Sequence, residues 1–96
     1  MIKTEKIIEA KPYFIVCKFN NGEIKKLFVE PLFSQNKNSF SAQKILDKDF
    51  FGTVRVGDLG QLYWKDAATM KDENGNSISC EYDMSPEFVY FNSQKI

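Results

Sequence analysis

The sequence contains no histidine and only one arginine, Arg55. Histidine is the side chain most often used as a general base near neutral pH, and its neutral imidazole is the commonest metal ligand. Its absence excludes serine–histidine and cysteine–histidine nucleophile pairs. The glycines form neither a P-loop nor a dinucleotide-binding motif, so no phosphate-binding loop of those types is expected. These absences favour a protein that is not an enzyme and needs no cofactor.

Long apolar runs and metal-binding cysteine motifs are missing as well. No stretch of about 18 apolar residues could form a transmembrane helix. The start, Met1-Ile2-Lys3, is not followed by the apolar core of a signal peptide. The two cysteines, Cys17 and Cys80, are not spaced like zinc ligands. We therefore expect a cytoplasmic protein whose thiols are reduced, buried and structural.

The apolar residues that are present suffice for one folded domain. Hydrophobic residues make up 43% of the chain and aromatic residues 15%, which is typical of a packed globule and not of a disordered chain. A chain of this length buries roughly 60–65% of its extended surface on folding. We expect a single domain over residues 1–96.

The net charge is zero, but the charges are unevenly distributed. Residues 1–48 carry nine lysines and five acids, a net charge of +4, whereas residues 49–96 carry four basic residues and eight acids, a net charge of −4. Either the two halves attract each other, or the asymmetry has no function, or a basic edge docks an acidic partner. A neutral chain has no strong field for anionic partners, so we expect no membrane binding and no direct nucleic-acid binding.

Residues 13–29 form two apolar-rich runs around an Asn-Asn-Gly turn. Glycine adopts a positive φ without steric cost, so this pattern predicts an antiparallel hairpin. A two-residue turn would place Lys18 opposite Lys25, whereas a three-residue loop would place Phe19 opposite Glu23. We favour the three-residue loop, because like charges directly opposite each other are unfavourable. The turn end of the hairpin carries Lys18, Lys25 and Lys26 and is expected to be solvated.

The rest of the chain predicts short strands and short helices in alternation. Strands are expected at 2–10, 53–56, 61–64 and 77–82, the last after a turn at 74–76. Helical turns or helices are expected at 30–33, after an N-cap at Ser41, at 66–70, and after Ser85-Pro86-Glu87. The fold class is therefore α+β, a mainly antiparallel sheet of five to six short strands with two or three short helices.

Two packing expectations accompany these helices. Phe40 is expected to anchor the polar loop 34–41, and Phe88 is expected to pack the C-terminal helix together with Phe91 or Tyr90.

Five motifs follow one another along almost the whole chain. They are Phe19-Asn-Asn-Gly22, Pro31-Leu32, Phe51-Gly-Thr-Val54-Arg-Val56, Gly60-Gln-Leu62-Tyr-Trp64 and the segment 83–90. In this order they resemble the bacterial family catalogued as domain of unknown function 2442. The family has no assigned activity; some members are followed by a helix-turn-helix and others lie beside toxin–antitoxin-like neighbours. The resemblance implies a small bacterial α+β domain, with an accessory or sensor role in regulation as one alternative.

Several patterns resemble chemical sites only superficially. Asp72, Asn74, Asn76 and Asp83 echo a calcium loop, but Ser77 stands where that loop requires glycine. We interpret this segment as a solvated hairpin tip and expect no bound metal.

Two further groups of side chains could in principle form a functional site. Four carboxylates could in principle pair for acid–base chemistry, and four aromatic residues could stack on single-stranded nucleic acid. Nothing in the sequence fixes their geometry, so we interpret the carboxylates as surface groups and the aromatic residues as core. The carboxylates are Asp47, Asp49, Asp58 and Asp66, and the aromatic residues are Tyr13, Phe19, Tyr63 and Trp64.

The apolar residues of the hairpin exceed what the short helices can cover. Phe14, Val16 and Phe28 share one face, and Tyr13, Ile15 and Leu27 share the other. One sheet face should therefore stay partly uncovered, and an exposed apolar patch usually marks an interaction site.

We therefore predict a non-enzymatic protein-interaction module that binds another protein or a second copy of itself, with an accessory or sensor domain as the alternative and an enzyme third. The predicted contact face consists of Phe14, Val16, Lys18, Lys26 and Phe28.

Overall fold

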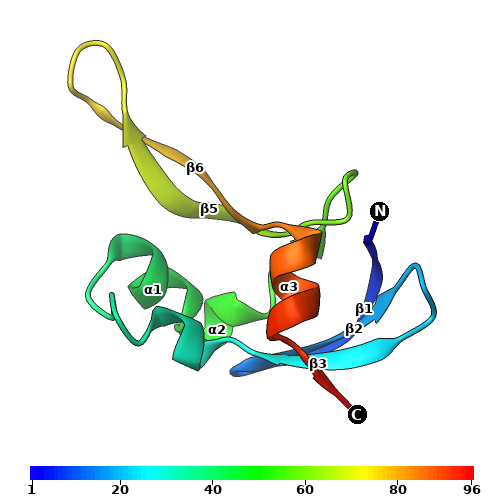
Figure 1. Ribbon diagram of the computed structural model, residues 1–96. Helices are drawn as coiled ribbons and strands as arrows, with labels where there is room; N and C mark the ends of the chain where they lie inside the picture. The colour runs from blue at the N-terminus through cyan, green and yellow to red at the C-terminus, as the bar shows by residue number, and fades with distance from the viewer.

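Two antiparallel β-sheets, three α-helices and one 3-10 helix make up the fold in the computed structural model, which describes residues 1–96 (Figure 1). The first sheet has the order β1-β2-β3-β7, with β1 (Thr4–Lys11), β2 (Phe14–Phe19), β3 (Ile24–Phe28) and β7 (Gln94–Lys95). The second has the order β4-β5-β6, with β4 (Arg55–Val56), β5 (Leu62–Lys71) and β6 (Ser77–Met84). The helices are η1 (Glu30–Phe33), α1 (Phe40–Ile45), α2 (Lys48–Phe51) and α3 (Pro86–Asn92). The predicted α+β class is confirmed, but seven strands form two sheets in place of one.

One hydrophobic core lies between the two sheets and the helices. It contains 15 buried residues, drawn from both sheets and from every helix. Trp64 of β5 is fully buried, and its Nε1–H donates a hydrogen bond of 2.9 Å to the carbonyl oxygen of Phe51 in α2. Phe33 of η1 is buried and Leu32 half-buried, as expected for the helical turn. No helix is both long and apolar enough to cross a membrane.

The β2–β3 hairpin has the predicted three-residue loop. Phe14 lies opposite Phe28, and the Phe19 N–H donates to the carbonyl of Glu23 at 2.9 Å. Gly22 has a φ of 89°, so it supplies the left-handed residue that closes the loop. The preference for the three-residue loop is therefore confirmed.

The β5–β6 hairpin is longer than predicted. Residues 66–70 were expected to form a loose turn, but β5 continues to Lys71 and pairs with β6 on both sides of an interruption. Between Trp64 and Ala68, four steps along β5 face two steps along β6, which marks a β-bulge. Asp66 lies in this bulge and has a left-handed backbone conformation, with a φ of 62°. Its carboxylate accepts a hydrogen bond of 2.8 Å from the Ser79 hydroxyl.

Helix α1 begins two residues earlier than expected. Ser39, and not Ser41, is the N-cap, because its hydroxyl accepts a hydrogen bond of 3.1 Å from the Ala42 N–H. Phe40 is then the first helical residue, and its side chain is 50% exposed. Its predicted role as an anchor is wrong, and Ala42 and Ile45 hold the helix instead.

Helix α3 has the predicted N-cap and a different packing face. The Ser85 hydroxyl accepts a hydrogen bond of 3.1 Å from the Phe88 N–H. Val89 is fully buried, and Tyr90 contacts Phe19 edge-to-face at 5.1 Å between ring centroids. Phe88 and Phe91 lie one turn apart on the other side of the helix and are exposed, so only Tyr90 was predicted correctly.

Lys25 is buried, although the turn end of the hairpin was expected to be solvated. It lies on the core side of β3 and is 9% exposed. Its ammonium donates a hydrogen bond of 2.7 Å to the carbonyl of Tyr90 and lies 3.9 Å from the centroid of the Tyr90 ring. These two contacts offset the cost of burying the charge and tie α3 to β3.

Glu23, at the end of the hairpin loop, also contacts Tyr90 of α3. Its carboxylate accepts hydrogen bonds from the Tyr90 hydroxyl and from the Asn21 side-chain amide, the latter at 2.8 Å, and Lys95 lies 3.7 Å away. The Tyr90 hydrogen bond, followed by the Asn21 hydrogen bond, lowers the pKa of Glu23 below its usual value. The ionised form of Glu23 therefore favours the docked position of α3.

The first prediction concerns the glycine of the hairpin loop. Substitution Gly22→Ala should lower the free energy of unfolding by about 1–2 kcal/mol, because alanine is strained at positive φ. A Cβ at this position meets no atom within 4 Å, so a clash would not explain the loss. Gly52→Ala is the matched control, with equal space and a φ of −70°. Urea denaturation that shows equal effects for both variants would refute the role assigned to Gly22.

The second prediction concerns the buried ammonium. Lys25→Met keeps the length of the side chain but removes the donor to the Tyr90 carbonyl, so unfolding should become easier by about 1–3 kcal/mol. Lys18→Met on the opposite side of the sheet should leave stability nearly unchanged. Thermal and urea unfolding of both variants measures the difference, and an unchanged stability of Lys25→Met contradicts this account of α3.

The third prediction concerns pH. The pKa of Glu23 is lower in the folded protein than in the unfolded chain, whose value is about 4.3. Its stabilising contribution is therefore present above that pH and is lost as the pH falls through the folded value. Wild-type stability should decline more steeply with acidification than that of Glu23→Gln, whereas Glu5→Gln should follow the wild type. Denaturation midpoints across this range test the slope, and parallel curves for wild type and Glu23→Gln would disprove it.

Candidate functional site

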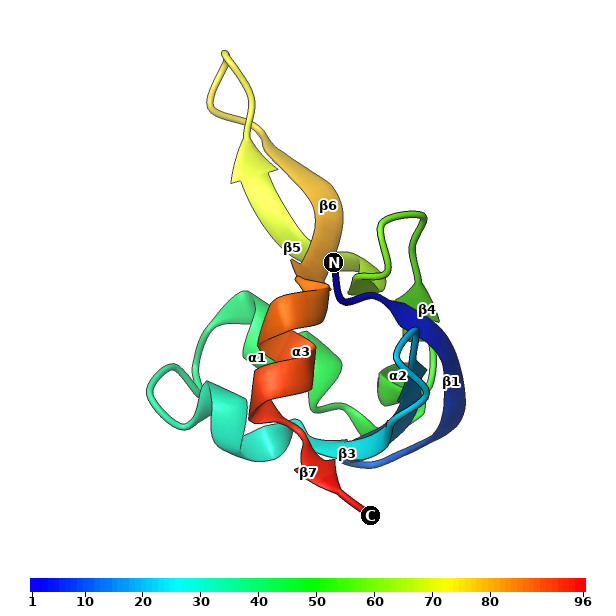
Figure 2. The same ribbon diagram turned by 45° about the vertical axis from the view of Figure 1, so that its right-hand side comes forward.

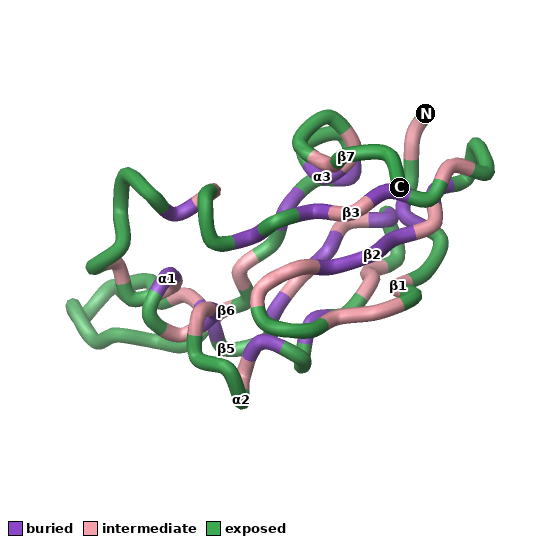
Figure 3. Tube along the Cα trace, turned by 90° about the horizontal axis from the view of Figure 1, so that it is seen from below, coloured by how far each residue is buried: buried purple, intermediate pink, exposed green.

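The four-stranded sheet has one face in the core and one face in solvent. Ile15, Cys17 and Leu27 point into the core and are fully buried, so the neighbouring residues of β2 and β3 point away from it. Figure 3 views the molecule from this side, and no helix crosses in front of β1, β2 and β3. We call this surface the outer face. It consists of Lys6, Glu9 and Lys11 of β1, Phe14, Val16 and Lys18 of β2, and Ile24, Lys26 and Phe28 of β3.

The structure brings all five predicted contact residues onto the outer face. Phe14 lies opposite Phe28, and Val16 lies opposite Lys26. Val16 is only 8% exposed, so it forms the floor of the face and offers little surface of its own. Ile24 was not predicted to contribute, but it is as exposed as Phe28, at 44% and 42% respectively. Its position could have been found from the alternation that places Lys26 and Phe28 on this side.

Lys26 lies between the aromatic residues of the outer face. Its ammonium is 4.1 Å from the ring centroid of Phe14 and 5.2 Å from that of Phe28. Both distances allow cation–π attraction, which holds the lysine stem against the apolar surface. No carboxylate lies within 4 Å of this ammonium, because the only two ion pairs of the protein involve Lys11 and Lys95.

The charges of the outer face are unbalanced. Lys6 lies directly opposite Lys18 across the β1–β2 pair, an arrangement that is unfavourable in an isolated sheet. The only ion pair on the face joins Lys11 to Glu9 at 3.2 Å. Four lysines and one glutamate therefore surround the exposed apolar residues, and the positive charge lacks a partner within the chain.

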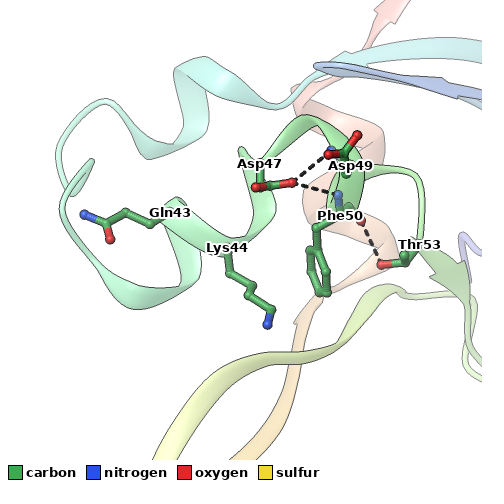
Figure 4. Close-up of a pocket in the computed structure, with 6 residues that line it drawn as sticks. All are labelled: Gln43, Lys44, Asp47, Asp49, Phe50 and Thr53. Carbon is green, nitrogen blue, oxygen red and sulfur yellow. Dashed lines mark hydrogen bonds between the residues drawn. The ribbon is translucent and has the colours of Figure 1, made fainter.

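A second surface feature is a hollow of about 400 Å³ beside α1 and α2, shown in Figure 4. Two of its polar side chains, those of Asp47 and Thr53, serve the local fold. The Asp47 carboxylate accepts hydrogen bonds from the N–H groups of Asp49 and Phe50, at 2.9 and 3.1 Å, and thereby caps α2. The Thr53 hydroxyl donates to the Phe50 carbonyl at 2.8 Å. Since these side chains are engaged in capping, the geometry does not present them to a substrate.

The four carboxylates considered for acid–base chemistry are only partly brought together. Asp47 and Asp49 line the same hollow, but Asp58 lies in the β4–β5 connection and Asp66 in the β5 bulge. The Asp66 carboxylate is bound by the Ser79 hydroxyl. The four carboxylates therefore do not converge on one site.

The segment that echoes a calcium loop forms the tip of the β5–β6 hairpin. The Asp72 carboxylate accepts hydrogen bonds from the N–H groups of Asn74 and Asn76, at 2.9 and 2.8 Å. The structure contains no cluster of three or more histidine, cysteine, aspartate or glutamate side chains suited to a metal ion. These contacts agree with the interpretation of a hairpin tip.

The aromatic residues considered for base stacking belong mainly to the core. Trp64 and Phe19 are fully buried, and half-buried Tyr13 packs edge-to-face on Phe51 with 5.5 Å between ring centroids. The sequence analysis interpreted these aromatic residues as core, and the burial of Trp64 and Phe19 agrees with that interpretation.

The two cysteines occupy different environments. Both are free thiols, as expected. Burial raises the pKa of Cys17 to about 12, so its reactive thiolate is suppressed. Cys80 lies on β6 and is only half-buried, so the expectation of burial holds for Cys17 alone.

Comparison with known proteins gives no relative, because no family model, no curated protein and no solved structure matches the chain.

Proposed function

We propose that the protein is a non-enzymatic interaction module whose outer face binds a complementary surface of another protein. The observation that carries this proposal is the combination of exposed Ile24 and Phe28 with lysines that have no acidic partner in the chain. The partner surface would be acidic and would contain apolar side chains. The proposal includes a cytoplasmic location, where two free thiols remain reduced.

The apolar part of the outer face supports a protein partner. Interface centres are enriched in aromatic residues and are surrounded by polar rims. Here Phe14, Ile24 and Phe28 lie along two paired strands whose other side is packed in the core, so a partner could cover them without rearranging the core. Little conformational entropy would be lost when a partner covers them.

The charged part of the outer face supports an acidic partner. Carboxylates placed near Lys6 and Lys18 would relieve the like-charge contact that the free protein tolerates. Charges at the rim of an interface mainly speed association and select the partner, and they add less to affinity. The apolar residues would therefore determine how long the complex lasts, and the lysines would determine which surface is accepted.

The motif resemblance to domain of unknown function 2442 supports a second form of the same proposal. In that form the chain is a bacterial accessory or sensor domain, and its outer face contacts a separate regulatory chain. The free outer face is compatible with both forms, and the identity of the bound protein separates them.

The fourth prediction tests the outer face by photo-crosslinking in cells that express the protein. Replacing Phe28 with the photoreactive residue benzoylphenylalanine should trap a specific protein, because this aromatic position would lie inside the interface. The same replacement at Phe91, which is 77% exposed on α3, is the control and should trap nothing specific. Adding Lys18→Glu should reduce the yield from position 28 by about tenfold, since the rim charge is then reversed.

Three outcomes of this experiment would contradict the proposal. Equal crosslink yields at positions 28 and 91 would show that the outer face is not the binding site. A yield at position 28 that is unchanged by Lys18→Glu would show the same. A trapped protein that lacks an acidic segment at the crosslinked position would also contradict the predicted partner chemistry.

A further inference from the structure

The outer part of the β5–β6 hairpin projects from the rest of the molecule as a two-stranded ribbon, as both Figure 1 and Figure 2 show. We call residues 68–80 the arm. The projection gives the protein an extent of 46 Å along its longest axis, against 24 and 22 Å along the others. An isolated two-stranded ribbon is only marginally stable in water, so the arm gains stability if a further strand joins it.

One side of the arm carries a continuous apolar stripe. Met70 lies directly opposite Ile78, and Ala68 lies directly opposite Cys80. Met70 and Ile78 are 54% and 44% exposed, whereas Tyr82 continues the stripe toward the core and contacts Phe33 there. The stripe therefore starts in the core and runs outward into solvent.

Strand β6 is an open edge without the usual protection. The sheet order β4-β5-β6 leaves one side of β6 unpaired along eight residues. Exposed edges are commonly protected by proline, by charged side chains such as lysine, or by β-bulges. Strand β6 contains no proline or lysine, and its two charged residues, Glu81 and Asp83, lie outside the arm, so the part of the edge within the arm carries no charge. The extra residues of the bulge near Asp66 belong to β5, so β6 itself is continuous. By contrast, β1 at the edge of the other sheet carries lysines and has two irregularities in its register.

We propose that β6 pairs antiparallel with β6 of a second copy, so that two arms form one four-stranded sheet. The sequence of β6 is complementary to itself in this orientation. Pairing centred on Ser79 or Cys80 places Glu81 opposite a serine, so no like charges face each other. The same centres keep Ile78, Cys80 and Tyr82 of both copies on one side of the sheet, whereas a shift by one residue would separate the two stripes.

The symmetry of this pairing limits it to two copies. Antiparallel pairing of the same strand is a two-fold, isologous contact, in which each copy uses up its open edge. Ile78 and Cys80 of both copies would then lie side by side on the two central strands of that sheet. The outer face takes no part, so the dimer and the proposed partner complex can form on the same molecule.

The fifth prediction tests the arm by sedimentation of the purified full chain over a range of concentrations. The wild type should form dimers, and Ile78→Lys should weaken dimerisation by at least about tenfold, because a charge enters the shared stripe. Phe28→Lys is the matched control, since it makes a similar change at 42% exposure on the outer face, and it should leave dimerisation unchanged. Near-ultraviolet circular dichroism verifies that both variants are folded.

A crosslinking measurement tests the geometry without altering the stripe. A short bismaleimide should join two wild-type chains through Cys80, because the proposed pairing brings the two thiols close together. Cys80→Ser should give no covalent dimer, since Cys17 is fully buried. A wild type that is monomeric at every concentration overturns the proposal. Dissociation by Phe28→Lys but not by Ile78→Lys also overturns it, because association would then use the outer face.

Discussion

The buried indole of Trp64 holds the two sheets and α2 around one core. Burial of an indole N–H without a partner would be costly, and the Phe51 carbonyl satisfies it with a hydrogen bond of 2.9 Å. Trp64 also packs against the Phe51 ring at 5.9 Å between centroids, and Phe51 in turn contacts Tyr13 beside β2. The inner side of the four-stranded sheet and the base of the three-stranded sheet thereby share one core. None of the residues of this core belongs to the outer face or to the arm.

The features that could be predicted from the sequence are those decided within a few residues. The hairpin loop follows from Gly22 and from repulsion between Lys18 and Lys25, and the start of α3 follows from Ser85 and Pro86. The placement of the predicted contact residues on one face follows from the strict alternation of a strand. These local signals needed no knowledge of distant neighbours.

The features that were missed depend on contacts between distant segments. Residues 66–70 have no strand-like alternation, and β5 extends beyond its bulge because Ala68, Thr69 and Met70 pair with β6. The burial of Lys25 depends on the Tyr90 carbonyl, which lies 65 positions away in the sequence. In α3 the apolar residues occur on both sides of a short helix, so the sequence alone could not decide that Val89 would be buried and Phe88 exposed.

The uneven charge along the sequence becomes a separation in space. Four of the nine lysines of the first half lie on the outer face, whereas the arm comes from the acidic second half. The only ion pair between the two halves joins Lys95 to Glu23. The two halves therefore do not neutralise each other through close contacts. The outer face therefore keeps its excess of lysines, which is the charge that the proposed acidic partner would meet.

The position of Trp64 has a further consequence for spectroscopy. It is the single tryptophan of the protein, and its indole is enclosed at the junction of the sheets, away from both the outer face and the tip of the arm. Its fluorescence therefore reports on the integrity of the core alone. An emission spectrum that stays constant while a ligand binds would show that binding occurs on a preformed surface, and a shift toward longer wavelength would reveal that the junction itself has opened.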